Sequence, residues 1–472
     1  MKKIILTALS ILALVSCQSN DAYEDLNRDP KNPTKVDASF LYNNATKSLV
    51  DQMTSTNVNT NIFRMLGQHW TETTYVDEAN YDFNTRNITN AHWSEMYRDV
   101  ILDLSTAKTN TEATAISPSF TQATKDSRLA QIEILSVYAW ANLVETFGDI
   151  PYSQSLNPGT YVLPVYDDAA TIYSDLLTRL NAAIPNLTNT GFGASDPIYA
   201  GNPASWKKFG NSLKLRMGIR IVDVPAMSAK AQSAITTAVS GGVFSSNADN
   251  AALKYESASP NTNPVWVDLV QSGRSDFVIA NTLVDFMNNL SDPRRSVYFD
   301  QNLGTGVYKG GPYGENNSFT SYTHVSSTVI DPTNPASLLD YAEVNFYLAD
   351  AAERSISGTP VSAAGFYNKG ITASFEQWGA TGVADATAPG TWKVKIGNQL
   401  WLAMYNRGFE AWTAWRTYDM PGFNLPAVSG LPVPTRYTYP ISEQNLNKTN
   451  YTAASTAIGG DKQTTKLFWD KN

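Results

Sequence analysis

The side chains that could carry out catalysis or bind a metal are few and scattered along this chain. Among its 472 residues are three histidines, His69, His92 and His324, and a single cysteine, Cys17. A zinc site needs several His or Cys ligands, and a disulfide needs two cysteines. The sequence motifs of serine hydrolases, zinc proteases, P-loop proteins and dinucleotide-binding proteins are absent. These residues therefore indicate neither a metal nor a cofactor.

Carboxylates are the remaining groups with catalytic potential. Glycoside hydrolysis uses two Asp or Glu side chains that can lie far apart in a sequence, so the sequence alone leaves this chemistry open. One polar cluster, formed by Asp77, Glu78, Asn80, Asp82 and Asn84, offers oxygen atoms to a hard cation. It lacks the ligand spacing and the glycine of a calcium-binding EF-hand loop, and we predict no metal there.

The elements that must position any functional group belong to a large folded body. Hydrophobic residues make up 42% of the chain, which is too much for a disordered protein. The net charge is −8, whereas a general nucleic-acid binder needs a basic surface to displace counterions. We therefore predict a globular protein that does not bind nucleic acid.

The N-terminus resembles the signal sequence of a bacterial lipoprotein. Lys2 and Lys3 precede the apolar run Ile4–Val15, which is too short to cross a hydrocarbon core of ~30 Å. The segment Leu14–Cys17 then resembles a lipobox, in which the cysteine becomes the first residue of the mature protein and carries the lipid. The alternative is a secretory peptide that is cut further along and takes Cys17 with it.

The lipobox interpretation sets the boundaries of the N-terminal part. It predicts a lipoprotein signal peptide at 1–16, lipid attachment at Cys17 and a lipid-anchored tether at 17–36, which is polar and contains two prolines. Each buried CH₂ of an acyl chain adds ~0.8 kcal/mol of membrane affinity, so several chains anchor a folded body stably. No later stretch approaches the ~20 apolar residues of a membrane-spanning helix.

The rest of the chain alternates between helical and irregular patterns. Apolar residues at helical spacing predict helices over 37–68, 90–108, 126–147, 168–184, 204–222, 226–240, 276–290, 338–356, 362–378 and 396–416. Asp126 or Ser127 can cap the 126–147 helix, and Gly148 can end it. In the 204–222 helix the apolar stripe predicts a core face, and Arg216 is expected to pair with carboxylates.

Between these helices lie long irregular segments, chiefly 70–88, most of 242–336 and the tail 417–472. They are rich in Gly, Pro, Asn, Ser and Tyr, which favours loops and short strands. We therefore predict a mostly α fold, a tetratricopeptide-like helical-repeat scaffold with long irregular loop insertions and short strands. We expect one domain over 37–472, with ligand-binding insertions near 70–88 and 242–336, because loops this long are usually functional.

Several segments, taken in order along the chain, resemble motifs of the SusD/RagB family, in particular its second SusD-like branch. They are Asn27–Thr34, Phe147–Tyr152, Asp196–Asn202 with Trp206–Arg216, Asp292–Arg294, Ala342–Ala352 and Tyr439–Asn450. Each motif alone is weak, but their order and spacing together are specific. The resemblance implies an outer-membrane lipoprotein that faces the cell exterior and is not an enzyme. It also implies that the protein binds an oligosaccharide or polysaccharide and delivers it to a SusC-like TonB-dependent transporter.

A sugar-binding site needs flat aromatic rings for the apolar sugar faces and polar groups for the hydroxyls. The loop segments contain both kinds of residue, with one run at 70–88, which includes Tyr75, and a second over 255–322. The residues that we predict to contact the ligand are Trp70, Tyr81, Phe83, Trp266, Arg274, Tyr313, Tyr322 and Asn316. The competing interpretation of each aromatic residue is packing in the core.

Three other functions stay open on the sequence alone. An oligopeptide-binding lid of the same kind of transporter would bind its ligand mainly through backbone-directed hydrogen bonds. An enzyme on a helical scaffold would need a carboxylate pair or a nucleophile–base pair in the loop region. A structural or adhesion lipoprotein would have no ligand site.

Overall fold

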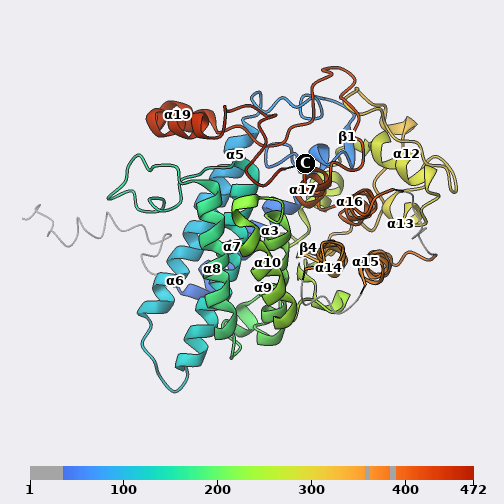
Figure 1. Ribbon diagram of the computed structural model, residues 1–472. Helices are drawn as coiled ribbons and strands as arrows, with labels where there is room; N and C mark the ends of the chain where they lie inside the picture. Colours follow the sequence, from blue (N-terminus) through green and yellow to red (C-terminus); the bar gives the residue numbers. More distant parts are fainter. Residues whose placement is uncertain (1–35, 357–361, 383–389, 472) are drawn as a thin grey trace, which may run out of the picture.

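The computed structural model describes residues 36–356, 362–382 and 390–471 (Figure 1). The predicted signal peptide, Cys17 and nearly all of the tether lie outside the described residues. The described part is mostly helical, as predicted. None of its helices combines the length and the apolar character needed to cross a membrane.

The scaffold consists of helices that pack mainly against their neighbours in sequence. Its helices are α3 (Ala38–Thr54), α5 (Ile88–Ser94), α6 (Leu102–Ala113), α7 (Gln122–Phe147), α8 (Ala169–Ala183), α9 (Pro203–Arg220), α10 (Ser228–Gly241), α14 (Tyr341–Glu353), α15 (Ala363–Trp378), α16 (Trp392–Ala403) and α17 (Gly408–Tyr418). The closest pairs are α7 with α8, α9 with α10, α14 with α15, and α16 with α17, together with α3 and α6, which are further apart in sequence. In Figure 1, α6 to α10 run side by side, and α14 to α17 are seen nearly end-on to the right of them. This is the predicted tetratricopeptide-like arrangement.

The remaining helices and the strands lie in the loops between these helices and in the tail after α17. They are α4 (Phe63–Leu66), α11 (Pro264–Trp266), α12 (Asn281–Asn289), α13 (Arg295–Tyr298), α18 (Ile441–Leu446), α19 (Lys448–Ala457) and the strands β1 (Trp70–Glu72), β2 (Ala251–Leu253), β3 (Phe277–Ile279) and β4 (Ala336–Leu339). The strands form two antiparallel pairs, β1 with β3 and β2 with β4. The first pair joins the two predicted insertions, because Trp70 lies opposite Ile279.

Local capping chemistry sets where several helices begin. Asp168 accepts a hydrogen bond from the Thr171 amide at 2.7 Å at the start of α8. The start of α7 differs from the prediction, because the helix begins at Gln122, before Asp126 and Ser127. There Thr121 caps the helix by accepting from a backbone amide. Gly148 ends α7 with a φ of +92°, as predicted.

Four of the predicted helical spans depart from the prediction, and the tail that was predicted to be irregular contains two short helices. The span 37–68 breaks between α3 and α4, and 396–416 splits into α16 and α17. The span 276–290 starts as β3, and 338–356 starts in β4. The tail 417–472 contains α18 and α19. In the spans 276–290 and 338–356, the first residues pair with a distant strand. Apolar periodicity within a short window cannot distinguish a buried strand from a buried helical turn.

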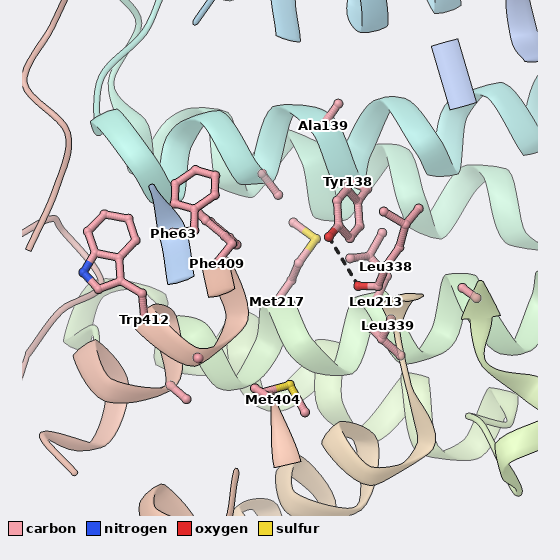
Figure 2. Packing of buried hydrophobic residues seen from close by; sticks show 14 of the residues in the cluster. Phe63, Tyr138, Ala139, Leu213, Met217, Leu338, Leu339, Met404, Phe409 and Trp412 are labelled. Carbon is pink, nitrogen blue, oxygen red and sulfur yellow. Dashed lines mark hydrogen bonds between the residues drawn. The ribbon is translucent and has the colours of Figure 1, made fainter. Parts of the chain in front are cut away.

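Part of the hydrophobic core lies where α7, α9 and α17 meet β4 (Figure 2). The predicted core face of the 204–222 helix is confirmed, since Trp206, Phe209, Leu213 and Met217 are all at most 1% exposed. Figure 2 shows Leu213 and Met217 packed near Tyr138, whose hydroxyl donates to the backbone carbonyl of Leu338 at 3.3 Å. The core therefore connects the helical scaffold to the end of the 242–336 insertion.

A buried ionic network lies beside this core. Arg216 donates to both carboxylate oxygens of Glu343, at 2.7 and 2.8 Å, and its third nitrogen lies 3.0 Å from Glu410. Arg407 also binds Glu343, at 2.8 Å, and Asp340, at 2.8 Å. The predicted pairing of Arg216 with carboxylates is confirmed. Burial pushes the pKa of Glu343 upwards, but the two guanidinium groups outweigh it and hold that pKa below its usual value.

Candidate ligand-binding groove

The two predicted insertions meet in the structure and share one part of the hydrophobic core. Besides the β1–β3 pair, the side chain of Asn80 donates to the backbone carbonyl of Gly314 at 2.8 Å. The rings of Tyr81 and Tyr313 pack with their centroids 6.0 Å apart. Segments more than 200 residues apart in sequence therefore form one surface.

This shared core contains four of the rings that we predicted to contact a ligand. Trp70, Tyr81, Phe83 and Tyr313 are at most 2% exposed. Trp70 lies beneath the guanidinium of Arg64, Phe83 packs against another buried ring, and the Tyr313 hydroxyl donates to a backbone carbonyl at 2.8 Å. The structure corrects the prediction for these residues, because the energy of burying large rings places them between the loops.

The other four predicted residues keep part of their surface. Arg274 is exposed and lines a cleft between the two insertions. Asn316 is exposed, and Trp266 and Tyr322 are half-buried, but none of these three lines the hollows described below. Their contact with a ligand stays a prediction.

The loop cleft is a hollow of about 260 Å³ between the insertions. Its walls include Asn57 and Asn59 from the turn after α3, Tyr75 and Arg86 from the first insertion, and Arg274 from the second. It therefore combines amide and guanidinium donors with an aromatic ring. These are the groups that recognise a hydroxylated ligand with apolar faces.

Tyr75 is the accessible ring of the loop cleft. It is 72% exposed, and the Arg86 guanidinium lies 5.8 Å from the centre of its ring. Its φ of +54° is in the left-handed region, which a bulky side chain rarely adopts. Strained positions of this kind are held by surrounding structure and gather at functional sites. Tyr75 stands in the aromatic run of 70–88, but no local pattern separates it from the rings that became buried.

The carboxylates of the loop cleft are occupied by partners within the protein. Glu78 forms an ion pair with Arg86, and Asp276 lies 3.4 Å from the side-chain nitrogen of Arg274. Burial raises the pKa of Glu72 well above its usual value, and the neighbouring Glu78 raises it further. The negative charge of the cleft is therefore reduced, and the exposed guanidinium of Arg274 remains accessible from solvent.

A second hollow continues the loop cleft along the surface. The helix groove has a volume of about 500 Å³ and is lined by polar side chains that include Gln52, Asn90 and Arg98. Asn59 lines both hollows, so they adjoin at the turn after α3. Burial raises the pKa of Glu95 in the helix groove to about 7, and the nearby Asp99 adds to this effect. We call the loop cleft and the helix groove together the surface groove.

The comparisons with known proteins identify the family. Residues 30–440 match the profile of the SusD-like family described as starch-binding and associating with the outer membrane. The chain belongs to the SusD-like family. The predicted resemblance is therefore confirmed over most of the sequence.

Solved structures share this fold. A chitin-binding SusD homolog from Flavobacterium johnsoniae is 23% identical with a TM-score of 0.76, covering 91% of this chain and 99% of the homolog. A SusD homolog from Bacteroides uniformis is 25% identical with a TM-score of 0.76, covering 92% and 100%. A further chitin-binding protein is 24% identical with a TM-score of 0.78, covering 92% and 100%. No protein with a curated description matches the chain at a significant level.

The SusD-like motifs of this chain prove to be structural. Asp196 is buried and accepts hydrogen bonds from the indole nitrogen of Trp206 at 2.6 Å and from the Gly201 amide at 2.8 Å. In the last motif, the side chains of Asn447 and Asn450 donate to backbone carbonyls of the 163–164 segment at 2.8 and 3.0 Å. These motifs identify the family because they hold its loops and helices together.

Proposed function

We propose that this SusD-like protein is a cell-surface lipoprotein that binds an oligosaccharide or polysaccharide in the surface groove. A single domain over 37–472 would follow a signal peptide at 1–16 and a lipid anchor at Cys17, on the outer leaflet of the outer membrane. The body would deliver its glycan to a SusC-like TonB-dependent transporter. The observation that carries the proposal is the exposed ring of Tyr75, which lines the loop cleft together with the exposed guanidinium of Arg274.

The chemistry of the groove suits a sugar chain. A pyranose ring has an apolar face that stacks on an exposed aromatic ring, and its rim hydroxyls both donate and accept hydrogen bonds. Tyr75 offers the ring, and Asn57, Asn59 and Arg274 offer polar groups around it. Because the loop cleft opens into the helix groove at Asn59, a polymer can continue beyond the residue that stacks on Tyr75.

Binding without catalysis is supported by how the carboxylates are used. Glycoside hydrolysis needs one carboxyl group as an acid and a second as a base or nucleophile, both reaching the scissile bond. In the loop cleft, Glu78 is paired with Arg86, and Asp268 accepts from the side chain and backbone of Thr56 at 2.9 and 3.2 Å. The family profile, with its description as starch-binding and associating with the outer membrane, supports the same function.

Delivery requires the protein to change partners or position while it holds the glycan. A glycan that contacts both the surface groove and the transporter would favour the closed complex by its differential affinity for the two states. The body would then act as a lid over the transporter.

The test is isothermal titration calorimetry on the full-length protein in detergent. The probes are maltoheptaose, chitohexaose and a mixed oligopeptide pool, chosen because the family is described as starch-binding and two similar structures are chitin-binding. We expect saturable binding of an oligosaccharide, weakened ~10-fold by Tyr75→Ala through the loss of stacking. The matched control is Tyr161→Ala, which removes a 40% exposed ring that lines neither hollow.

Two outcomes would contradict the proposal. Oligosaccharide binding that Tyr75→Ala and Arg274→Ala leave unchanged would place the glycan outside the loop cleft. Binding of the peptide pool alone would favour an oligopeptide-binding lid, which the sequence left open. Copurification of the protein with a TonB-dependent transporter from outer membranes tests the delivery step separately.

A further inference from the structure

A larger hollow lies on the other side of α3 from the surface groove. This inner cavity has a volume of about 920 Å³, near the upper end of the range of ~300–1,000 Å³ that is typical of ligand sites. Near its C-terminal end, α3 directs Val50, Met53 and Thr54 to the inner cavity, whereas Asp51 and Gln52 line the helix groove. The inner cavity shares no lining residue with the surface groove.

Two aromatic rings of the inner cavity are partly exposed and held rigidly. Trp378, at the end of α15, packs against Tyr298 and Tyr405 with ring centroids 4.9 and 5.6 Å away. Those two rings are buried and stack on each other at 4.2 Å, so they fix the indole from behind. Tyr199 is fixed through its hydroxyl, which donates to the backbone carbonyl of Asp249 at 2.7 Å. Rigid rings that keep an exposed surface are ready to stack on a ligand without an ordering cost.

Two residues that line the inner cavity also carry buried polar atoms without partners. Among the described residues, the side-chain oxygen of Asn247 and one carboxyl oxygen of Glu410 are buried and make no hydrogen bond. Both residues line the cavity. The amide nitrogen of Asn247 donates to the Ala373 carbonyl at 3.0 Å, and the other Glu410 oxygen lies 3.0 Å from Arg216. Both side chains are therefore fixed with one oxygen unsatisfied, at a cost of ~1–3 kcal/mol each.

These features select the chemistry of the ligand. A purely apolar ligand would leave the two oxygens unsatisfied, and a strongly charged one would have to be desolvated beside an ionic network that is already paired. A hydroxyl group both donates and accepts, so it satisfies Asn247 and Glu410 whether or not the carboxyl is protonated. A sugar has such hydroxyl groups, and it also has an apolar ring face that can stack on Trp378.

We propose that the inner cavity is a second carbohydrate-binding site, distinct from the surface groove, which takes a short oligosaccharide or the end of a longer chain. Trp378 stacks on a sugar ring at the wall, and Asn247 and Glu410 receive sugar hydroxyls. Tyr138 and Phe409, two of the core residues labelled in Figure 2, also line the cavity. With α3 as a common wall, the two sites bind separate stretches of glycan.

The test is hydrogen–deuterium exchange mass spectrometry on the full-length protein in detergent. The probes are maltotriose and chitotriose, and the background is Tyr75→Ala, which weakens the surface groove. We expect slower exchange at 247–254, 334–338 and 376–380, which contribute to the cavity lining. Trp378→Ala should raise the probe concentration needed for protection ~10-fold through the loss of stacking. The matched control is Trp392→Ala, which removes a half-buried tryptophan outside the cavity and should change nothing.

A second variant covers the case in which Trp378→Ala disturbs folding. Ala248 is exposed and lines the inner cavity, so Ala248→Trp places a large ring at its mouth without touching the core. It should abolish protection of the cavity segments and leave the thermal midpoint unchanged. The proposal is overturned if a millimolar concentration of the probe does not slow exchange in any of the cavity segments. This holds whether or not the probe slows exchange in the loop cleft. It is also overturned if Ala248→Trp leaves protection intact. Because Tyr75→Ala weakens the surface groove, protection of the cavity segments in this background tests the inner cavity independently of glycan binding in the surface groove.

Discussion

Replacing Arg216 by methionine tests whether the buried ionic network holds the scaffold together. Methionine fills much of the space of the aliphatic stem but removes the guanidinium, which binds Glu343 twice, the Leu338 carbonyl at 2.9 Å and Glu410. The side chains of Arg216 and Glu410 are 4% exposed and that of Glu343 is fully buried. The variant therefore leaves acidic groups buried with fewer partners and no access to water.

Breaking a buried ion pair by removing one partner costs ~3–5 kcal/mol, and we expect Arg216→Met to lose this much unfolding free energy. A chain of 472 residues has an unfolding entropy of ~1 kcal/mol per kelvin, so the midpoint of thermal unfolding should fall by ~3–5 °C. The assay is differential scanning calorimetry at neutral pH. The control is Arg98→Met, because the Arg98 side chain is 67% exposed and its pairing with Asp99 is worth ~0–1 kcal/mol.

Acid should reduce the effect of Arg216→Met. The pKa of Glu343 is held below its usual value in the folded protein, so this pairing stabilises the fold above the unfolded pKa and is lost as the pH falls. A double variant, Arg216→Met with Glu410→Leu, should lose less than the sum of the single variants, because it removes one of the charges left unpaired. A loss for Arg216→Met no larger than that for Arg98→Met would refute the reasoning.

Two further predictions concern titration and backbone space. Burial raises the pKa of Glu410 to about 7 in the folded protein, so its proton stabilises the fold at acid pH and this gain is lost between about pH 4.5 and 7. In chemical denaturation, Glu410→Gln should therefore become more stable relative to the parent as the pH rises through that window; a constant difference would contradict the shift. Gly201 has a φ of +78°, and a Cβ there would lie 2.0 Å from the Thr190 carbonyl oxygen. Gly201→Ala should thus cost at least ~2 kcal/mol of unfolding free energy, whereas Gly159→Ala, with no atom within 4 Å of the added Cβ, should fall within ~0.5 kcal/mol of the parent. Equal losses of unfolding free energy for the two variants would contradict this prediction, because they would show that the backbone around Gly201 shifts to make room for the added Cβ.

The scaffold was predictable because it depends on short-range patterns. The apolar stripe of 204–222 reports the buried face of α9, since residues three and four apart share one side of a helix. Gly148 ends α7 because its positive φ suits glycine. The order of the motifs identified the SusD-like family for the same reason, because they are local pieces of structure such as the Asp196–Trp206 contact.

The breaks in the scaffold were not predictable from the same patterns. The segment at 277–279 has helical spacing, yet it pairs with β1 because a strand partner more than 200 residues away is available. The chain at 404–407 leaves the helical conformation between α16 and α17, and Arg407 there joins the ionic network. Such choices depend on contacts between distant segments, which a window of sequence does not contain.

The proposed ligand site shows the same division most clearly. The sequence by itself determined that rings and polar groups gather in 70–88 and 242–336, and the structure joins these insertions through β1 and β3. Only the tertiary structure decided that Trp70 is buried and Tyr75 is exposed. Irregular loops have no period that separates an inner from an outer face. The side that each ring takes is therefore set by the neighbouring loop that covers it, and this neighbour is known only once the chain has folded.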